Sequence, residues 1–401
     1  MKVLSIIAQK PSETGSGIYL QELIKSSSYL GCENALVCAS YENDHFSIEE
    51  QVKTYKLIFD TKDFPYKIYG MSDEMPYESY KYSDMDDEHF KLWSEKFLSL
   101  IEKAITECNP DILVCHHLYL LTSLVREKYK DKKIVAICHT TDLRQYIKNS
   151  FKKDYIKEQI SKLDKIAVLT DYYKDLVVDI FGIEKDKVLT VGAGYNKELF
   201  NTNNRIDHYD DTVRLLFVGK VSIEKGVLSL VKAIKIIEYK YQDKIKAKKV
   251  LLNIIGSNGN KQELNEIITE AKNSNIEINF LGKKNQKEVA EYYKSSDILI
   301  LVSFNEGLPL TAIEAFASGM RIVISNLPGV KSFINDNISN ANVRFVDLPK
   351  FTNYKEITYE ELKSYEMRIA ESIVDSINDK AKNFADMTKI SWENIAKKLA
   401  E

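Results

Sequence analysis

Short apolar runs alternate with segments of helical periodicity along most of the chain. Continuous apolar runs bounded by turn residues are typical of parallel strands that are buried on both faces. In the first half, such runs predict strands at residues 2–8, 35–39, 111–115, 134–138, 165–170 and 188–191, with helices at 18–30 and 172–181. Strands that alternate with helices favour a doubly wound parallel sheet, whose ligands bind beyond the carboxyl ends of its strands.

A second alternating series follows a polar segment that lacks apolar periodicity. It predicts strands at residues 214–218, 250–255, 276–281, 297–302 and 322–325, with helices at 226–237, 262–271 and 312–318. The fold class that follows is α/β, with two Rossmann-like doubly wound parallel-sheet domains facing a cleft. We expect an N-terminal domain at residues 1–200, a linker at 201–212, a C-terminal domain at 213–380 and a closing segment at 381–401.

Composition narrows the functional classes. With 401 residues the chain is long enough for two domains with substantial cores. Its formal net charge of -3 provides no general field for nucleic acid. The five cysteines lie in the first half without CxxC spacing, so we expect reduced thiols, and no apolar run predicts a signal peptide or a membrane span. These features predict a cytoplasmic protein without a nucleic-acid partner.

The stretch FNEGLPLTAIEAFASG, which begins at Phe304, places two carboxylates at a strand-to-helix turn. Glu306 lies in the turn and Glu314 inside the helix, while Gly307 permits close backbone approach and Pro309 marks the helix start. The free amides of a first helical turn attract phosphate, and carboxylates accept hydrogen bonds from sugar hydroxyls. Together these groups predict a nucleotide-sugar site, although either glutamate taken alone can equally be a solvated side chain.

Two lysines follow the first strand of the second series, in GKVSIEKGV. Lys220 and Lys225 lie near the start of the next helix, where their charges add to the helix dipole around a diphosphate. In a chain rich in lysine they can also be ordinary exposed side chains. Their position at the same sheet edge as Glu306 favours the binding interpretation.

Histidines of the first half lie at predicted strand ends. His116 and His117 follow one strand, and His139 follows the next in CHTTDLRQ, with Asp142 and Arg144 nearby. A neutral imidazole at such an end faces the ligand crevice, where it can take a proton or donate to an anion. A structural role is the usual alternative for a single histidine, and no HxH, HExxH or Cys/His spacing predicts a metal site.

Three further segments permit more than one interpretation. The loop QKPSETGSG, with Gly15 and Gly17, either approaches a phosphate or sugar or is a flexible turn. The acidic, aromatic insertion at residues 66–90 either lines the acceptor side of the site or is a solvated loop, and its DMDD run is a weak candidate for metal binding. Residues 146–165 form either a solvated basic helix or a contact with an anionic membrane.

These motifs, in this order, resemble those of the retaining glycosyltransferases of family 4, which have the GT-B fold. In the second half the resemblance rests on GKVSIEKG, the strand ending FLG, SDILILVSFNEGLPLTAIEAFASG, SNLPGV and SWENIAKKL. In the first half it rests on the glycine loop, CHTTDLRQ and VGAGYNKELF. It covers nearly the whole chain, is most specific in the second domain, and implies a C-terminal helix at residues 392–399 that returns to the first domain.

The resemblance also implies a role for each residue that matches a family motif. The implied catalytic residues are His139, beside the reacting carbon, and Lys220, Lys225 and Glu306. The implied donor-binding residues are Gly17, Gly219, Lys220, Lys225, Gly256, Gly282, Glu306, Gly307, Leu308, Pro309 and Glu314. The implied acceptor-binding residues are Gly15, Ser16, His117, His139, Asp142 and Arg144. Two of these depart from the family pattern, since Lys220 stands where arginine is usual and Ser16 separates the two glycines of the loop.

The implied reaction is a retaining, metal-independent transfer of a hexosyl or N-acetylhexosaminyl group from a nucleotide-diphosphate sugar to an acceptor hydroxyl. No cofactor is expected, and a UDP-sugar is expected before a GDP-sugar. The sequence does not define the sugar, the linkage, the oligomeric state or the acceptor, which can be a glycan, a lipid-linked sugar or a small-molecule glycoside. Peripheral contact with the inner face of the membrane is a further expectation.

Two other functions remain open on the sequence. An epimerase or phosphorylase with a GT-B-like fold would share the architecture, and would reveal itself by epimerising free sugar or by phosphate-dependent cleavage without an acceptor. A non-catalytic nucleotide-sugar-binding subunit would bind nucleotide yet show neither transfer nor slow donor hydrolysis.

Overall fold

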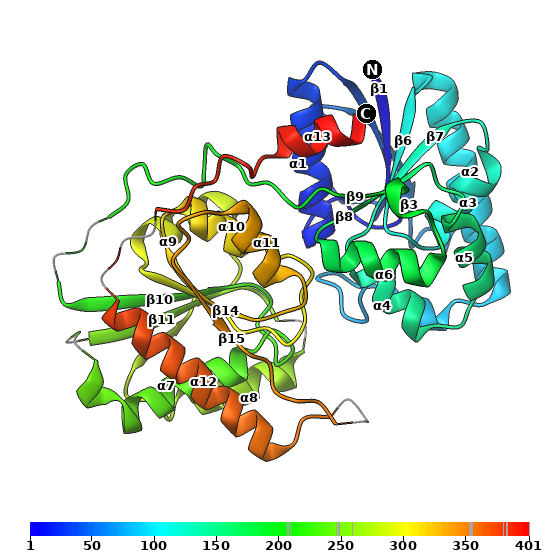
Figure 1. Cartoon of the computed structure of the whole chain (residues 1–401). Helices are drawn as coiled ribbons and strands as arrows, with labels where there is room; N and C mark the ends of the chain where they lie inside the picture. The colour runs from blue at the N-terminus through cyan, green and yellow to red at the C-terminus, as the bar shows by residue number, and fades with distance from the viewer. Residues whose placement is uncertain are drawn as a thin grey trace. The chain divides into compact units, whose positions relative to one another are not determined.

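The computed structural model describes residues 1–400 except 207, 209, 246, 248, 259, 353–355, 380, 382 and 383. The chain divides into two compact units, shown in Figure 1. Unit 1 contains Met1–Ala193 and Ser391–Glu401, and unit 2 contains Gly194–Ile390. Each unit has its own parallel sheet, so the predicted α/β class is confirmed. The exact domain and linker boundaries stay predictions, and residues 207 and 209 of the expected linker lie outside the described residues.

Unit 1 is built on a seven-stranded sheet whose neighbouring strands are all parallel. The spatial order is β3 (Lys53–Ile58), β2 (Glu33–Ser40), β1 (Lys2–Ile6), β6 (Ile112–His116), β7 (Lys133–Ile137), β8 (Lys165–Val168) and β9 (Val188–Thr190). All but β3 correspond to apolar runs of the sequence. As an edge strand, β3 buries only Tyr55 and Leu57, so its sequence alternates and lacks a continuous run.

Helices cover both faces of this sheet because alternate strand residues point to opposite sides. Leu36 and Cys38 of β2 pack toward α1 (Gly15–Tyr29), whereas Val37 lies in the larger core with α2 (Asp87–Cys108). The remaining helices of the first 193 residues are α3 (Leu120–Lys128), α4 (Thr141–Lys148), α5 (Lys153–Ile160) and α6 (Asp171–Phe181).

The last helix, α13 (Trp392–Ala400), belongs to unit 1 and lies beside α1, as Figure 1 shows. Its buried side chains are Trp392, Ile395, Ala396 and Leu399. The ring of Trp392 meets that of Tyr19 on α1 edge to face, with centroids 4.7 Å apart. The predicted return of the C-terminal helix to the first domain is therefore confirmed.

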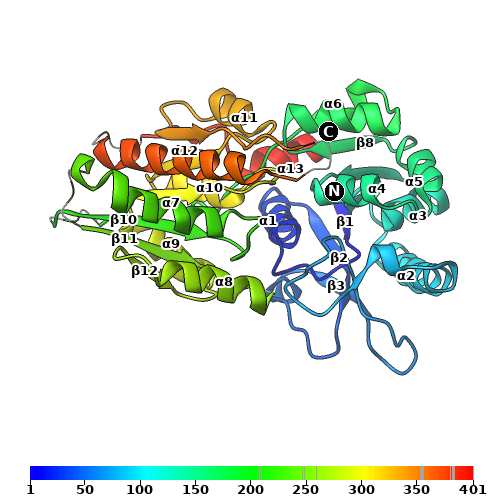
Figure 2. The ribbon, with the colours of Figure 1, turned by 90° about the horizontal axis from the view of Figure 1, so that it is seen from below.

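Unit 2 carries a six-stranded parallel sheet in the order β12 (Glu277–Phe280), β11 (Lys249–Ile255), β10 (Thr212–Val218), β13 (Ile298–Leu301), β14 (Arg321–Ser325) and β15 (Val343–Val346). Its helices are α7 (Val227–Lys240), α8 (Lys261–Ala271), α9 (Gln286–Ser295), α10 (Leu310–Ala317), α11 (Val330–Asn337) and α12 (Tyr359–Asn378). Figure 2 shows α7 and α12 running side by side along this unit. Within the described part of the chain, no helix has both the length and the apolar character needed to cross a membrane.

Candidate functional site

Unit 2 brings together a lysine and a glutamate that are 81 residues apart in the sequence. The Nζ atom of Lys225 lies 2.5 Å from Oε1 of Glu306, and the two side chains are 24% and 27% exposed. Lys225 precedes α7, and Glu306 lies in the turn between β13 and α10. The amide of Phe304 donates to the carbonyl of Glu224 at 3.0 Å and so fixes this turn against the segment that holds Lys225. A cation and a carboxylate thus meet, in partial contact with solvent, at the carboxyl edge of the sheet.

A glycine makes this approach possible. Gly226 has a φ of +74°, and a Cβ atom at this position would lie 1.9 Å from the carbonyl oxygen of Val302. Such a distance is far inside van der Waals contact, so any other residue would push the start of α7 away from the end of β13. The separation of Lys225 and Glu306 therefore depends on the missing side chain of Gly226.

Replacing Gly226 by alanine is expected to destabilise unit 2 by about 3 kcal/mol, because left-handed strain adds to a steric clash. Gly282→Ala is the matched control, since Gly282 has a φ of +69° with no atom within 4 Å of its Cβ position. The control should cost only about 1 kcal/mol. The loss of stability in each variant is measured by the hydrogen exchange of peptides from β10 and β13. Equal losses of protection would show that the close approach of Val302 carries no cost.

Three glycines end the strands β10, β11 and β12. The amide of Gly219 donates to Ile255 O, and that of Gly256 donates to Gly282 O, both at 3.0 Å. A Cβ atom on Gly256 would lie 1.7 Å from the carbonyl oxygen of Gly219. Close backbone packing alone therefore explains glycine at position 256. The predicted contacts of these glycines with a donor stay predictions, as does that of Lys220, which follows Gly219 and is partly buried.

The helix α10 carries the second predicted glutamate. Glu314 lies inside this helix and is half-buried, and its Oε2 atom is 3.3 Å from the hydroxyl of Tyr293, which donates to it. Tyr293 is fully buried on α9 and was not among the residues predicted from sequence, because α9 itself was not recognised. Pro309 caps the start of α10 without a side-chain hydrogen bond, and Leu308 beside it is buried. The predicted strand-to-helix turn is therefore present, with Glu306 in the turn and Glu314 inside α10.

Unit 1 gathers polar side chains at the carboxyl ends of β1, β6 and β7. The Nδ1 atom of His116 lies 3.0 Å from Nε2 of His139, and the ring of His117 has its centroid 4.8 Å from that of His139. The Nε2 atom of Gln9 lies 2.8 Å from Ser16 Oγ and 3.2 Å from His117 Nε2. Four of these five residues were singled out in the sequence; Gln9 was named there only as part of the glycine loop.

These histidines are neutral near pH 7. Burial lowers the pKa of His139 to about 3 and those of His116 and His117 well below their ordinary value of 6.5. His117 also has a φ of +74°, an uncommon conformation for a residue with a side chain. Its carbonyl accepts a hydrogen bond from Thr122 Oγ1 at 2.5 Å, which holds the strained turn in place. The cluster can exchange hydrogen bonds with hydroxyls but presents no positive charge of its own.

Asp142 organises the loops around this cluster. It is fully buried, and its Oδ2 atom accepts hydrogen bonds from the amides of Leu118 at 2.7 Å and His139 at 3.4 Å. Burial raises the pKa of Asp142 to about 6, despite the lowering effect of these amides. The carboxylate therefore fixes the backbone on both sides of the cluster. Its predicted acceptor contact stays a prediction, as does that of the exposed Arg144.

The glycine-rich loop begins α1. Thr14 caps this helix by accepting a hydrogen bond from the amide of Gly17 at 3.0 Å. A Cβ atom on Gly17 would lie 2.6 Å from the amide nitrogen of Ser12, so the loop folds back on the first helical turn. Gly15, in contrast, is exposed and has no atom within 4 Å of its Cβ position. Of the predicted loop residues, Gly15 and Ser16 therefore remain accessible, while Gly17 serves loop packing.

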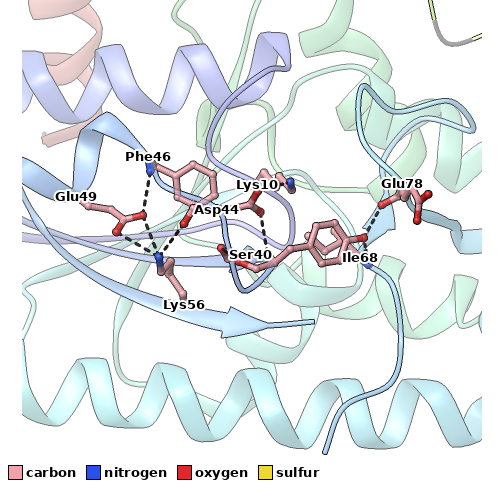
Figure 3. A network of polar contacts seen from close by, with 9 residues as sticks. Lys10, Ser40, Asp44, Phe46, Glu49, Lys56, Ile68 and Glu78 are labelled. Atoms are coloured by element: carbon pink, nitrogen blue, oxygen red, sulfur yellow. Dashed lines mark hydrogen bonds and ion pairs between the residues drawn. The ribbon is translucent and has the colours of Figure 1, made fainter. Parts of the chain in front are cut away.

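A buried lysine anchors the base of this loop. Lys10 is 5% exposed, its Nζ atom lies 2.7 Å from Oδ1 of Asp44, and it lies over the rings of Tyr41 and Tyr77. Figure 3 shows this ion pair together with the neighbouring contacts of Lys56. The charge of Lys10 is therefore already neutralised within unit 1. No sequence pattern predicts this pair, since Lys10 and Asp44 lie in separate loops.

The acidic insertion is folded rather than irregular. It contains the two-stranded parallel sheet of β4 (Tyr69–Gly70) and β5 (Tyr80–Lys81). Its carboxylates form ion pairs: Asp73 with Lys148, Glu78 with Lys67, and Asp87 with Lys152. Lys148 and Lys152 belong to the predicted basic helix, which the structure divides into α4 and α5. Some of its positive charge is thereby neutralised, and its contact with a membrane stays a prediction.

The DMDD run of the insertion has a structural role at the start of α2. Asp86 caps this helix by accepting a hydrogen bond from the amide of His89 at 2.8 Å. Across the described residues, no group of three or more histidine, cysteine or acidic side chains is arranged to hold a metal ion.

Sequence comparisons connect both units to one enzyme family. The family described as Glycosyltransferase Family 4 matches residues 14–199, and that described as Glycosyl transferases group 1 matches residues 200–347. The chain belongs to glycosyltransferase family 4. Its solved neighbours confirm the GT-B fold: this glycosyltransferase superposes over 99% of its length on 95% of WaaG, a glycosyltransferase of lipopolysaccharide biosynthesis, with a TM-score of 0.61 and 13% identity.

Curated relatives of this glycosyltransferase span most of its length. It is 24% identical over 339 residues to an uncharacterized glycosyltransferase of Methanocaldococcus jannaschii, covering 79% of this chain and 82% of the relative. It is 22% identical over 322 residues to the lipopolysaccharide 1,2-N-acetylglucosaminetransferase of Salmonella typhimurium, covering 77% and 76%. A further solved neighbour is Anabaena HepE in complex with UDP and glucose, with a TM-score of 0.62, 11% identity and coverage of 100% and 98%. The enzyme therefore transfers a sugar.

Proposed function

We propose that this glycosyltransferase moves a hexosyl or N-acetylhexosaminyl group from a nucleotide-diphosphate sugar, UDP before GDP, to an acceptor hydroxyl with retention of anomeric configuration. The observation that carries the proposal is the contact of Lys225 with Glu306 beside the first turn of α10. A diphosphate needs cations and amides, and a sugar needs hydroxyl acceptors. The pair presents both kinds of group within one contact, as a ligand with adjoining phosphate and sugar requires.

The same groups suit a reaction without a metal ion. As the bond between C1 and the diphosphate breaks, negative charge develops on the leaving oxygen, and Lys220, Lys225 and the amides of α10 would stabilise it. The acceptor oxygen would form its bond to C1 on the same face, and the leaving phosphate oxygen would take the acceptor proton. Glu306 would hold hydroxyls of the donor sugar and Glu314 those of the ribose.

The unit 1 cluster would receive the acceptor. Ser16 and His139 offer neutral hydrogen-bonding groups near the strand ends, which suits hydroxyls. His117 is 2% exposed and lies against Gln9, so it would act on the acceptor through Gln9 and Ser16. Support for a nucleotide donor comes also from two solved neighbours, one in complex with UDP and glucose and one bound with UDP-2-fluoro glucose. A relative named as an N-acetylglucosaminetransferase supports the expected class of sugar.

A thermal-shift panel of nucleotide diphosphates and nucleotide sugars tests the donor assignment. A nucleotide sugar that binds the folded protein should raise its melting temperature as the ligand concentration rises. At a ligand concentration a hundredfold above Kd, the free energy of unfolding should increase by about 2.7 kcal/mol. UDP-sugars are expected to give the largest shifts, and Lys225→Ala should reduce them. The anomeric configuration of the product formed from the best donor, measured by NMR, then tests retention.

The control for this panel is inorganic phosphate, which shares the charge but lacks the sugar and base. A shift produced equally by phosphate and by every nucleotide sugar would contradict the assignment. An inverted product would contradict retention while leaving the donor site intact.

A further inference from the structure

The rings of His116 and His139 meet edge to edge. Their planes differ by 12°, their centroids are 5.2 Å apart, and the Nδ1 atom of His116 lies 3.0 Å from Nε2 of His139. The centroid separation exceeds the N···N distance by about two ring radii. The two nitrogens must therefore point at each other along the line that joins the ring centres. This is the in-plane geometry of an N–H···N hydrogen bond rather than of face-to-face stacking.

Burial indicates which histidine donates. His116 is 2% exposed, and its other nitrogen, Nε2, is buried without a hydrogen-bond partner among the described residues. If the proton of His116 were on Nε2, a buried N–H group would be left without an acceptor, and such orphaned donors are rare and costly. With the proton on Nδ1, only a lone pair is left without a partner, and the N–H group points at His139.

We propose that His116 is a positioning residue, whose Nδ1–H donates to Nε2 of His139 and thereby holds the proton of His139 on its Nδ1 atom. The Nδ1 atom of His139 has no hydrogen-bond partner among the described residues and is not one of their buried unpartnered atoms. It is therefore the accessible nitrogen of the ring. His116 makes His139 a hydrogen-bond donor toward an oxygen of the bound substrate.

In the transfer step, where this inference rests on the proposed function, the proton on Nδ1 determines what His139 can do. A neutral histidine with Nδ1–H toward the substrate can donate a hydrogen bond but cannot accept the acceptor proton at that atom. When the bond from C1 to the leaving oxygen breaks and the bond to the acceptor oxygen forms, the acceptor proton must therefore pass to a group other than His139, which in the proposed reaction is the leaving phosphate oxygen. His139 neither gains nor loses a proton in the step.

Two substitutions of His116 separate this role from simple packing. Asparagine carries an amide at the position of the histidine Nδ1, so His116→Asn retains a donor for His139. His116→Leu fills the buried space but has no donor. Packing alone would favour leucine over asparagine at a site that is 2% exposed. The hydrogen-bond role predicts the opposite order.

The direct measurement is the 15N NMR spectrum of the full-length protein labelled at histidine, with His139→Gln used to assign the His139 signals. In the wild type and in His116→Asn we expect protonated Nδ1 and unprotonated Nε2 at His139. In His116→Leu this pattern should be lost. With the best donor and acceptor, kcat should fall at least tenfold in His116→Leu and by less than about threefold in His116→Asn, since one oriented donor is worth this much or more.

The spectrum does not depend on activity, so it separates this proposal from the proposed function. A wild-type His139 protonated on Nε2 would overturn the proposal, and so would a His116→Leu variant that keeps the Nδ1–H form. The expected spectra in a protein without transferase activity would sustain the tautomer and refute the proposed function instead. Better kcat for the leucine variant than for the asparagine variant would assign His116 to packing alone.

Discussion

Replacing Lys225 or Glu306 by alanine is expected to lower the rate of sugar transfer by about a hundredfold or more while unit 2 remains folded. Lys225 supplies positive charge where the leaving diphosphate would develop negative charge, and Glu306 supplies acceptors for the sugar hydroxyls. Each side chain is about one-quarter exposed, so its removal leaves a partner that water can reach. The loss should therefore be seen in kcat/KM for the best donor, with little change in the far-ultraviolet circular dichroism.

Unit 2 contains a matched control for this pair. Lys235 on α7 and Glu270 on α8 form an ion pair of 2.6 Å whose side chains are 23% and 26% exposed. Lys235→Ala removes the same chemical group at the same degree of burial, and it should leave transfer within about twofold. A charge-reversed variant, Lys225→Glu with Glu306→Lys, should re-form an ion pair but remain inactive. Near-normal transfer by Lys225→Ala, or recovery in the reversed pair, would show that the contact only supports the fold.

Lowering the pH from 7 to 5 is expected to destabilise unit 1. Burial holds the pKa values of His116 and His117 well below 6.5, so the unfolded chain binds protons that the folded unit does not. Stability is therefore lost as the pH falls below 6.5, by about 2 kcal/mol for each of these two histidines at pH 5. His139, whose pKa is lowered to about 3, contributes in the same direction.

Asp142 opposes this trend. Its pKa is raised to about 6, so the stability that its protonated form contributes is lost as the pH rises through 6. Between pH 7 and pH 5 this one group recovers roughly 1 kcal/mol, which is less than the histidines lose together. The net result is a less stable unit 1 at pH 5.

Both tryptophans of the protein, Trp93 and Trp392, are buried in unit 1, so urea unfolding followed by their fluorescence reports on this unit alone. His117→Asn should reduce the loss in the free energy of unfolding between pH 7 and pH 5 by about 2 kcal/mol. His45→Gln, at an exposed position, should leave the loss unchanged. Equal stability of the wild type at pH 5 and pH 7 would contradict the burial-induced lowering of these pKa values.

The sequence predicted most strands because buried parallel strands are continuous apolar runs. Residues 134–138 and 298–301 are clear examples, since every residue of β13 and nearly every residue of β7 is buried. The edge strand β3 was not predicted, because only Tyr55 and Leu57 are buried and its sequence has no continuous apolar run. The helix α12 was missed although Tyr365, Ile369 and Ile373 are buried at helical spacing, because its many charged residues obscured that pattern.

The sequence predicted those residues of the candidate site that follow a buried strand, but not the contacts between their side chains. Lys225 and Glu306 were expected at one sheet edge, and they are in contact there. The pairing of His116 with His139, and of Gln9 with His117, depends on side-chain directions in two loops with left-handed backbone, which a sequence pattern does not encode. The partner of Glu314, Tyr293, comes from a helix whose position in space only the folded chain defines.

The path of the chain has a consequence for how the molecule is made. Unit 1 is discontinuous, because α13 joins it only after all of unit 2 has been passed. During synthesis from the N-terminus, the surface of α1 that receives Trp392 stays uncovered until residues 391–400 leave the ribosome. Unit 2, in contrast, has all its residues before then. Unit 1 is therefore begun before unit 2 and completed after it, when α13 packs on α1.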